Sequence, residues 1–234
     1  VITTPFTFIA STNSIRYCQA VPVFVDINPD TFLLEPETIK TALQKHQAKA
    51  ILLVHLFGQM CNMGEIRKLA TEYGVALIED CAQAQGATWN SAKAGSIGEV
   101  GTFSFYATKN LPTGEGGMVT TQEDKIAAQL RRLINHGRSG GYEHVEVGYN
   151  YRMTDLVAAL GRVQLQKLEA GNAKRQAIAA KYQQEIDNPF ILHPKTQAQA
   201  DHVFHQYTIR SPYRDKLRDH LAAHGISAAV VYPK

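Results

Sequence analysis

The sequence predicts an α/β fold: a mostly parallel sheet covered by helices, followed by the start of a smaller C-terminal α/β domain. Short apolar runs alternate with helix-like segments over the first half of the chain, an order typical of strand–helix–strand units. Those runs are continuously apolar rather than alternating, which indicates strands buried on both faces. With 234 residues, 44% of them hydrophobic, the chain is long enough to bury a substantial core.

Three strands and two helices are predicted in the first third of the chain. Residues 22–27, 50–56 and 75–80 are short apolar runs, and we expect each to be a buried strand. Residues 36–44 have helical spacing and begin with a proline, which is favoured in the first turn of a helix. A second helix is predicted over 63–73, where the glycine that follows indicates its end.

The pattern changes after residue 100. Residues 101–106 and 117–121 are predicted to be short strands on either side of a polar loop that contains glycines. A helix is expected from 123 to 135. The glycine-rich stretch 137–148 is expected to be a loop.

A long helix is predicted over 154–186, followed by an alternating strand over 203–209 and a helix over 214–225. We place a large domain at residues 1–165, and a linking helix with part of a second domain at 166–234. The long helix is expected to carry five apolar residues on one side: Leu156, Leu160, Val163, Leu165 and Leu168.

The composition favours neither nucleic acid nor a membrane as a partner. The formal net charge is +3, from 24 Lys and Arg against 21 Asp and Glu, and the basic residues form no long run. No apolar run approaches the ~20 residues that span a bilayer, and no secretory signal precedes the first strand. Cys18, Cys61 and Cys81 lack the C-x-x-C spacing of zinc and redox sites. We therefore expect buried, reduced thiols in a cytoplasmic protein.

Polar side chains follow three of the predicted strands. His55, Asp80 and Ser104 come at the strand ends, with Gln83 and Lys109 a few residues further on. Because ligands of parallel α/β sheets gather beyond the carboxyl ends of the strands, these residues are candidates for one site.

Each candidate also has an ordinary interpretation. Asp80 is either a helix N-cap or the partner of a protonated ring nitrogen. Lys109 is either a solvated surface charge or a desolvated amine that is nucleophilic toward aldehydes. Ser104 is either a plain strand residue or a phosphate ligand, and Asn150 and Arg152 are either loop residues or part of the site.

The histidines do not predict a metal site. His136, His202 and His205 lack a convincing ligand spacing. His202 and His205 are three residues apart on a predicted strand, so they would face opposite sides. No metal is therefore expected.

Six blocks in this order and spacing resemble the DegT/StrS sugar aminotransferases, which belong to the fold-type I enzymes that depend on pyridoxal 5′-phosphate (PLP). The blocks are TPFTF at 4–8, VHLFGQ at 54–59, EDCAQA at 79–84, SFYATKN at 104–110, TGEGG at 113–117 and GYNYRM at 148–153. The resemblance runs along nearly all of the chain and implies the large domain of a fold-type I PLP-transferase.

The resemblance also implies a role for individual residues. Lys109 matches the lysine that holds PLP as a Schiff base, and Asp80 matches the carboxylate that pairs with the pyridine nitrogen. Gln83 matches a residue near the ring hydroxyl, and Phe8 matches an aromatic residue that stacks on the ring. Ser104 matches a phosphate ligand.

Asn150 matches an asparagine that reaches the phosphate of the neighbouring subunit's cofactor, which implies a homodimer with shared active sites. Family substrates are nucleotide-linked keto-sugars, with glutamate or glutamine commonly as the amino donor. The family's Gly-Ser/Thr phosphate turn lies upstream of residue 4, and the sequence ends near a segment that helps to shape the sugar site. We therefore expect a fragment of a longer enzyme.

Three alternatives stay open. Related dehydratases carry histidine in place of Lys109, and a regulatory relative could keep the fold without catalysis. Both Lys109 and Asp80 are present, which favours the aminotransferase. A generic nucleotide-binding domain is disfavoured because no G-x-G-x-x-G follows the first predicted strand.

Overall fold

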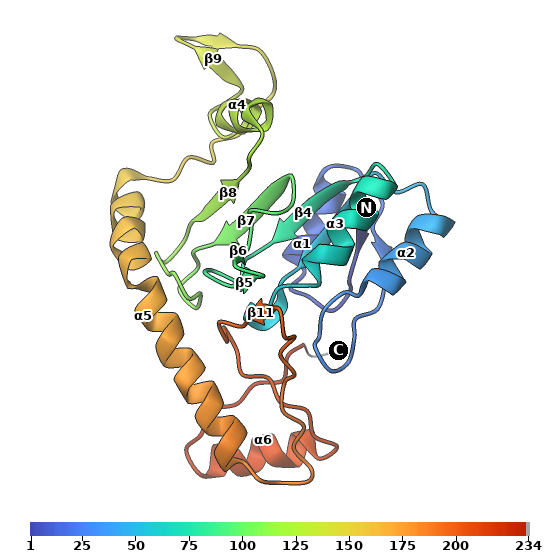
Figure 1. The fold of residues 1–234 in the computed structure, drawn as a ribbon. Helices are drawn as coiled ribbons and strands as arrows, with labels where there is room; N and C mark the ends of the chain where they lie inside the picture. The colour runs from blue at the N-terminus through green and yellow to red at the C-terminus, as the bar shows by residue number, and fades with distance from the viewer. Residues whose placement is uncertain (233–234) are drawn as a thin grey trace.

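The structure is a computed structural model of the chain and describes residues 1–232. Its centre is a six-stranded sheet with the order β2-β1-β3-β4-β7-β8 (Figure 1). The first five strands run parallel, and β8 is antiparallel to β7. The strands are β1 (Ile2–Thr3), β2 (Val23–Phe24), β3 (Ala50–Val54), β4 (Ala76–Asp80), β7 (Val100–Ser104) and β8 (Gly117–Thr120). The predicted α/β fold with a mostly parallel sheet is confirmed.

The middle of the sheet brings the candidate site residues to one edge. Val54 at the end of β3 lies opposite Asp80 at the end of β4, and Asp80 lies opposite Thr102 in β7. His55, Asp80 and Ser104 therefore occupy the carboxyl ends of three adjacent parallel strands, as the sequence predicts.

Three helices pack beside the first strands: α1 (Ala10–Tyr17), α2 (Pro36–Lys45) and α3 (Met63–Glu72) (Figure 1). Ile39 and Leu43 of α2 and Ile66 of α3 are buried in one core with Ile51 and Leu77 of the sheet. The predicted bounds of α2 and α3 are confirmed to within a residue. α1 was not predicted from the sequence.

The prediction of a buried strand over 22–27 is wrong in extent and in burial. Only Val23–Phe24 form β2, and Phe24 is 49% exposed. β2 is an edge strand of the sheet, so one of its sides has no neighbouring strand.

Two further expectations need correction. Residues 137–148 contain a short hairpin, β9 (Arg138–Gly140) paired with β10 (Glu143–His144), rather than a loop throughout. Residues 203–209 form no regular strand. Several main-chain groups of that stretch pair with a different part of the chain: Val203 N–H donates to Gly58 O, and Gln206 N–H donates to Phe57 O.

The segment with α4 (Asp124–Leu133) and the hairpin projects from the rest of the molecule (Figure 1). The chain then returns through α5 (Asp155–Glu185), a single helix of 31 residues. The predicted domain boundary after residue 165 falls inside α5 and stays a prediction.

The prediction that five apolar residues share one side of α5 is wrong. At about 100° per residue, Leu165 lies opposite Leu156. Leu156 is 86% exposed, and only Leu168 of the five is buried, in a small cluster with Phe105 and Leu111. The helix is held to the sheet mainly by that cluster and by polar contacts described below.

The last part of the chain folds back onto the sheet domain. β11 (Ala200–Asp201) pairs antiparallel with β5 (Thr88–Trp89), which also pairs with β6 (Ala92–Lys93). α6 (Arg214–Ala223) confirms the predicted helix. Among the described residues, no helix is both long enough and apolar enough to cross a bilayer.

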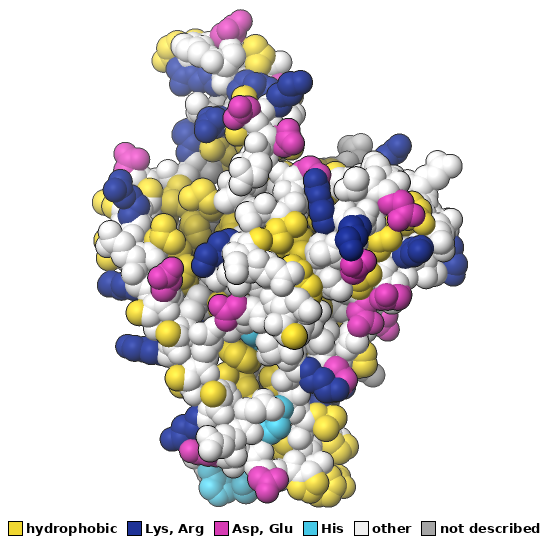
Figure 2. Space-filling model, in the orientation of Figure 1, with side chains coloured by type: hydrophobic (Ala, Val, Ile, Leu, Met, Phe, Trp, Pro, Cys, Tyr) yellow, Lys and Arg dark blue, Asp and Glu magenta, His cyan; other side chains and the backbone are white. Residues whose placement is uncertain are grey.

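The surface carries a broad set of exposed apolar residues. Figure 2 shows them around β8 and the neighbouring half of α5. They include Met118, Val119, Leu156, Leu160 and Val163, each at least 41% exposed. The cysteine prediction holds for Cys61 and Cys81, which are buried, and is wrong for Cys18, which is exposed.

Candidate active site

Asp80 is held in a fixed orientation at the end of β4. Its Oδ1 accepts a hydrogen bond of 3.0 Å from the Ala82 N–H, and its Oδ2 accepts one of 2.7 Å from the Ser11 hydroxyl. Residues 81–87 contain turns and no helix, so Asp80 is not the N-cap of a helix. A negative charge is thereby anchored at the carboxyl edge of the sheet.

Lys109 lies on a turn just after β7, where its N–H donates to Tyr106 O at 2.9 Å. The side chain is partly buried. Burial lowers the pKa of Lys109 below its ordinary value of 10.5, and the nearby Asp80 carboxylate acts in the opposite direction. The amine is therefore partly desolvated and lies within electrostatic reach of Asp80, unlike a fully solvated surface lysine.

Gln83 is buried between two elements near Asp80. Its Oε1 accepts from the Phe57 N–H at 2.7 Å, and its Nε2 donates to the Tyr232 hydroxyl at 3.4 Å. Phe8, in contrast, is 63% exposed. It stands just ahead of α1, the helix that supplies Ser11 to Asp80.

Ser104 is the last residue of β7, the strand that precedes Lys109. Its Oγ accepts from the Tyr106 N–H at 3.3 Å, so its own hydrogen can be donated elsewhere. Its carbonyl accepts a bond of 2.6 Å from Nε2 of Gln85, which is almost fully buried.

Asn150 is not brought to this group of residues. It belongs to the segment that projects between β8 and α5, where it pairs with Asn135 through an isolated bridge and is exposed (Figure 1). Its neighbour Arg152 donates to the Asn135 side chain at 2.6 Å. In this chain the two residues therefore stabilise the projecting segment.

A buried polar cluster lies beneath the site. His55 Nδ1 accepts from the Cys61 N–H at 3.1 Å, so Nε2 carries the hydrogen that bonds Glu79 Oε2 at 2.9 Å. Glu79 also accepts from the backbone N–H groups of Gly95, Ile97 and Gly98 at 2.6 to 3.0 Å. Burial raises the pKa of Glu79, but these hydrogen bonds outweigh it and the net pKa is lowered.

His55, Glu79 and Cys81 have ligand atoms close enough together for a metal ion. Both Glu79 oxygens and both His55 nitrogens, however, already take part in hydrogen bonds. Burial raises the pKa of the Cys81 thiol well above its ordinary value. We therefore assign the cluster a structural role, in which it ties β3, β4 and the loop 95–98 together.

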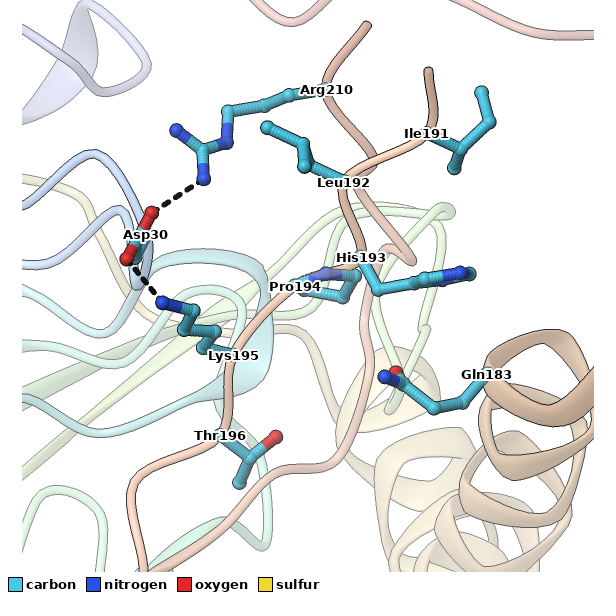
Figure 3. A pocket seen from close by; sticks show the side chains of 9 residues that line it. All are labelled: Asp30, Gln183, Ile191, Leu192, His193, Pro194, Lys195, Thr196 and Arg210. Atoms are coloured by element: carbon cyan, nitrogen blue, oxygen red, sulfur yellow. Dashed lines mark hydrogen bonds and ion pairs between the residues drawn. The ribbon is translucent and has the colours of Figure 1, made fainter. Parts of the chain in front are cut away.

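A separate cavity of about 680 Å³ lies near the C-terminal segment and contains none of the predicted site residues. Figure 3 shows Asp30 between Lys195 and Arg210, with ion pairs of 2.5 Å to each. The two cations thus already have a carboxylate partner. The cavity does not extend the site around Lys109.

The fold and this site define a class of protein: an α/β protein with a partly buried lysine and an anchored carboxylate near the carboxyl edge of a mostly parallel sheet. Comparison with known sequences makes the assignment specific. The chain matches the DegT/DnrJ/EryC1/StrS aminotransferase family over residues 1–234 and belongs to that family.

Several relatives are similar along the whole chain. It is 42% identical to a pleiotropic regulatory protein of Geobacillus stearothermophilus, over 100% of this chain and 63% of that protein. It is 40% identical to a GDP-perosamine synthase of Caulobacter vibrioides, over 99% of this chain and 65% of the synthase.

A solved structure has the same fold. The crystal structure of Streptomyces venezuelae DesV in complex with a ketimine intermediate superposes with a TM-score of 0.95 at 37% identity. The match covers 100% of this chain and 63% of DesV. The chain thus spans slightly less than two thirds of the length of these relatives, from 63% to 65%.

Sequence reasoning missed Ser11, the hydroxyl partner of Asp80. Ser11 lies in α1, a helix of eight residues with only Ser11 and Ile15 buried. So short a helix leaves a weak apolar pattern. The link between Ser11 and Asp80 joins residues 69 positions apart, and no local spacing indicates it.

Proposed function

We propose that this chain belongs to a PLP-dependent aminotransferase that transfers an amino group from an amino acid, glutamate being the expected donor, to a nucleotide-linked keto-sugar. The observation that carries the proposal is the partly buried Lys109 amine within electrostatic reach of the anchored Asp80 carboxylate. A desolvated amine of this kind reacts with aldehydes, and an anchored carboxylate stabilises a protonated ring nitrogen.

The donor set fits PLP. When bound, PLP supplies an electron sink for the substrate carbon. Asp80 would hold a proton on the ring nitrogen. The Lys109 amine would bind PLP through its aldehyde group with loss of water, and, once the amine of the substrate had displaced it, would move a proton between the substrate carbon and C4′. Ser104 would donate its hydroxyl hydrogen to a phosphate oxygen, because its Oγ accepts from Tyr106 N–H and leaves that hydrogen available.

Two other residues complete the proposed cofactor site. Gln83 would lie beside the ring hydroxyl, and its amide is fixed by Phe57 and Tyr232. Phe8 presents an exposed ring, which is free to stack on a flat ligand. A nucleotide-linked sugar is supported by the relatives, since the Caulobacter protein is a GDP-perosamine synthase.

We also propose a homodimer in which Asn150 reaches the phosphate of the partner's cofactor. Two features support this arrangement. Asn150 is exposed and pairs with Asn135 in the segment between β8 and α5, which projects from the rest of the molecule. The neighbouring surface carries exposed apolar residues over β8 and α5, a pattern that marks protein interfaces.

The test of this function is Lys109→Ala in the full-length protein. In the wild-type protein, borohydride should reduce the imine and so attach the cofactor permanently to the peptide that contains Lys109. In the variant, no such attachment should form. Transamination of a nucleotide keto-sugar with glutamate should fall to background. Lys40→Ala, which changes an exposed lysine of α2, is the matched control and should keep both the link and the activity.

A regulatory role is the second candidate, because the relative from Geobacillus stearothermophilus is described as a pleiotropic regulatory protein. A wild-type protein that binds PLP through Lys109 yet turns over no keto-sugar with any donor would favour it. A dehydratase is disfavoured because Lys109 stands where related dehydratases carry histidine.

A further inference from the structure

We propose that Asn110, Asn172 and His205 form a hydrogen-bonded latch that holds the Lys109 turn against α5 and the segment 202–206, and thereby positions the Lys109 amine. The three residues come from different parts of the chain: the turn after β7, the middle of α5, and the segment after β11. They are positioning residues, and this inference rests on the proposed role of Lys109.

Asn110, the neighbour of Lys109, is the centre of the latch. Its Nδ2 donates to Asn172 Oδ1 at 2.9 Å and to the Val203 carbonyl at 3.3 Å. Both amide hydrogens are thereby used, and Oδ1 can only accept. His205 Nδ1 lies 3.1 Å from that oxygen, so His205 must carry its hydrogen on Nδ1 and act as the donor.

Asn172 connects the latch by hydrogen bonds to the end of β7. It is 7% exposed, and its Nδ2 donates to the Gln85 carbonyl at 2.9 Å. Gln85 in turn donates to the Ser104 carbonyl at 2.6 Å. A Cβ on Gly86 would lie 2.7 Å from Asn172 Nδ2, so this close approach of α5 requires a glycine there. One chain of hydrogen bonds therefore runs from α5 to the end of β7.

His205 is held as a neutral donor. Burial lowers its pKa to about 4, and the cations Lys109 and Arg175 act in the same direction. The Arg175 guanidinium donates to the carbonyls of Phe204 and His205 at 3.3 and 3.2 Å, which fastens this stretch of backbone to α5. The latch therefore keeps one protonation state at neutral pH.

The consequence concerns the solvent around the Lys109 amine. Lys109 and Asn110 are adjacent, between Phe105 and Leu111, which pack on Leu168 of α5. The Lys109 N–H donates to Tyr106 O within the turn, and the Asn110 side chain supplies the bonds that tie the turn to α5 and to the segment 202–206. Without the latch, Lys109 and Asn110 lose these side-chain bonds, and we expect the Lys109 amine to become more hydrated. Burial, which lowers the pKa of Lys109, would then be reduced, and the pKa would rise toward its ordinary value.

His205→Phe and His205→Asn make a matched pair for the test. Phenylalanine keeps a ring of similar size but cannot donate, whereas the Asn side-chain amide places a donor where Nδ1 stood. The experiment uses the full-length protein stripped of cofactor. The rate of reductive methylation of Lys109 is followed by mass spectrometry as a function of pH, with Lys40 in the same digest as the reference for reagent decay.

The measured quantity is the methylation rate of Lys109 at pH 8 divided by its maximal rate at high pH. In His205→Phe we expect this ratio to fall about three- to tenfold relative to wild type, because a rise of one unit in the pKa of Lys109 lowers the fraction of free amine about tenfold. His205→Asn should restore the wild-type ratio. A merely structural histidine would change unfolding without changing this ratio in the folded protein.

An unchanged ratio in folded His205→Phe, or an Asn variant that behaves like the Phe variant, would overturn the latch. If His205→Phe does not fold, Asn172→Ser removes the same support from the α5 side and is read in the same way. The methylation measurement needs no cofactor and therefore tests the latch independently of the proposed function. A wild-type protein that forms no borohydride-reducible link with PLP would refute the aminotransferase proposal, and the methylation ratio would still decide on the latch.

Discussion

At the scale of single residues, Lys109 is subject to two opposing effects. Burial favours the neutral amine, and the Asp80 carboxylate favours the charged one, with burial the larger effect. Asp80 itself keeps two hydrogen-bond donors, Ser11 and the Ala82 N–H. The result is a lysine that loses its proton more readily than a surface lysine while its anionic neighbour stays fixed.

This balance predicts how the stability of the cofactor-free protein depends on pH. Because the folded-state pKa of Lys109 lies below 10.5, the unfolded chain binds more protons between the two values, and the contribution of Lys109 to stability rises with pH in that window. Lys109→Met should lack this rise. Urea unfolding from pH 7 to 10 measures it, and parallel curves for the two proteins would contradict the lowered pKa.

Asp80→Asn tests the anchored charge. The amide keeps the size of the side chain but supplies no negative charge to a ring nitrogen. We expect kcat to fall about 10²- to 10³-fold, the usual effect of removing one electrostatic contact from a transition state. Asp187→Asn, at an exposed position after α5, should have little effect. Activity within tenfold of wild type in Asp80→Asn would exclude the assigned role.

At the scale of elements, the site depends on how the short turn after β3 meets the C-terminal segment. The 3₁₀ turn Leu56–Gly58 has positive φ angles at Phe57 (58°) and Gly58 (106°). Val203 and Gln206 donate to the carbonyls of these two residues, and Phe57 donates to Gln83. The turn therefore connects the segment of His205 to a proposed cofactor ligand.

Gly58→Ala should destabilise the fold by about 2 kcal/mol or more, because φ is positive and the new Cβ would lie 2.8 Å from the His205 backbone nitrogen. Gly171→Ala is the control. Gly171 lies in α5 with nothing within 4 Å of a Cβ, and alanine there should stabilise by about 1 kcal/mol. Thermal unfolding compares the two, and equal effects would show that Gly58 is not required.

At the scale of the whole molecule, much apolar surface is left uncovered around β8 and α5. Leu156 is 86% exposed, and Leu160 and Val163 follow it on the same side of the helix at 44% and 47%. The projecting segment next to them adds Tyr149 and Tyr151, whose rings stack with centroids 4.8 Å apart. Apolar surface of this extent is typical of an interface.

Leu156→Arg should weaken the proposed homodimer at least about 30-fold, as expected when a central apolar contact is lost. Since Leu156 makes little contact within its own chain, the protomer should stay folded. Sedimentation equilibrium of the full-length protein measures the change. Glu169→Lys, on the far side of α5, is the control for charge alone. A variant as dimeric as wild type would exclude this face from the interface.

Much of the fold follows from local patterns. The apolar runs at β3 and β4 and the helical spacing of α2 and α3 were sufficient because those elements bury their own residues in the core. β2 and α5 were partly mispredicted, since Phe24 and Leu156 are apolar residues that the chain leaves exposed. An apolar pattern indicates burial somewhere, including burial against another protein, and does not say where.

The sequence by itself determined the order of most strands and helices, the position of Asp80 at a strand end and that of Lys109 shortly after another strand, because strand burial and chain order are local properties. Only the tertiary structure decided what surrounds them. Ser11 reaches Asp80 across 69 positions, and His205 reaches Asn110 across 95. Such contacts depend on how distant elements pack against each other, and no spacing within one element records that geometry.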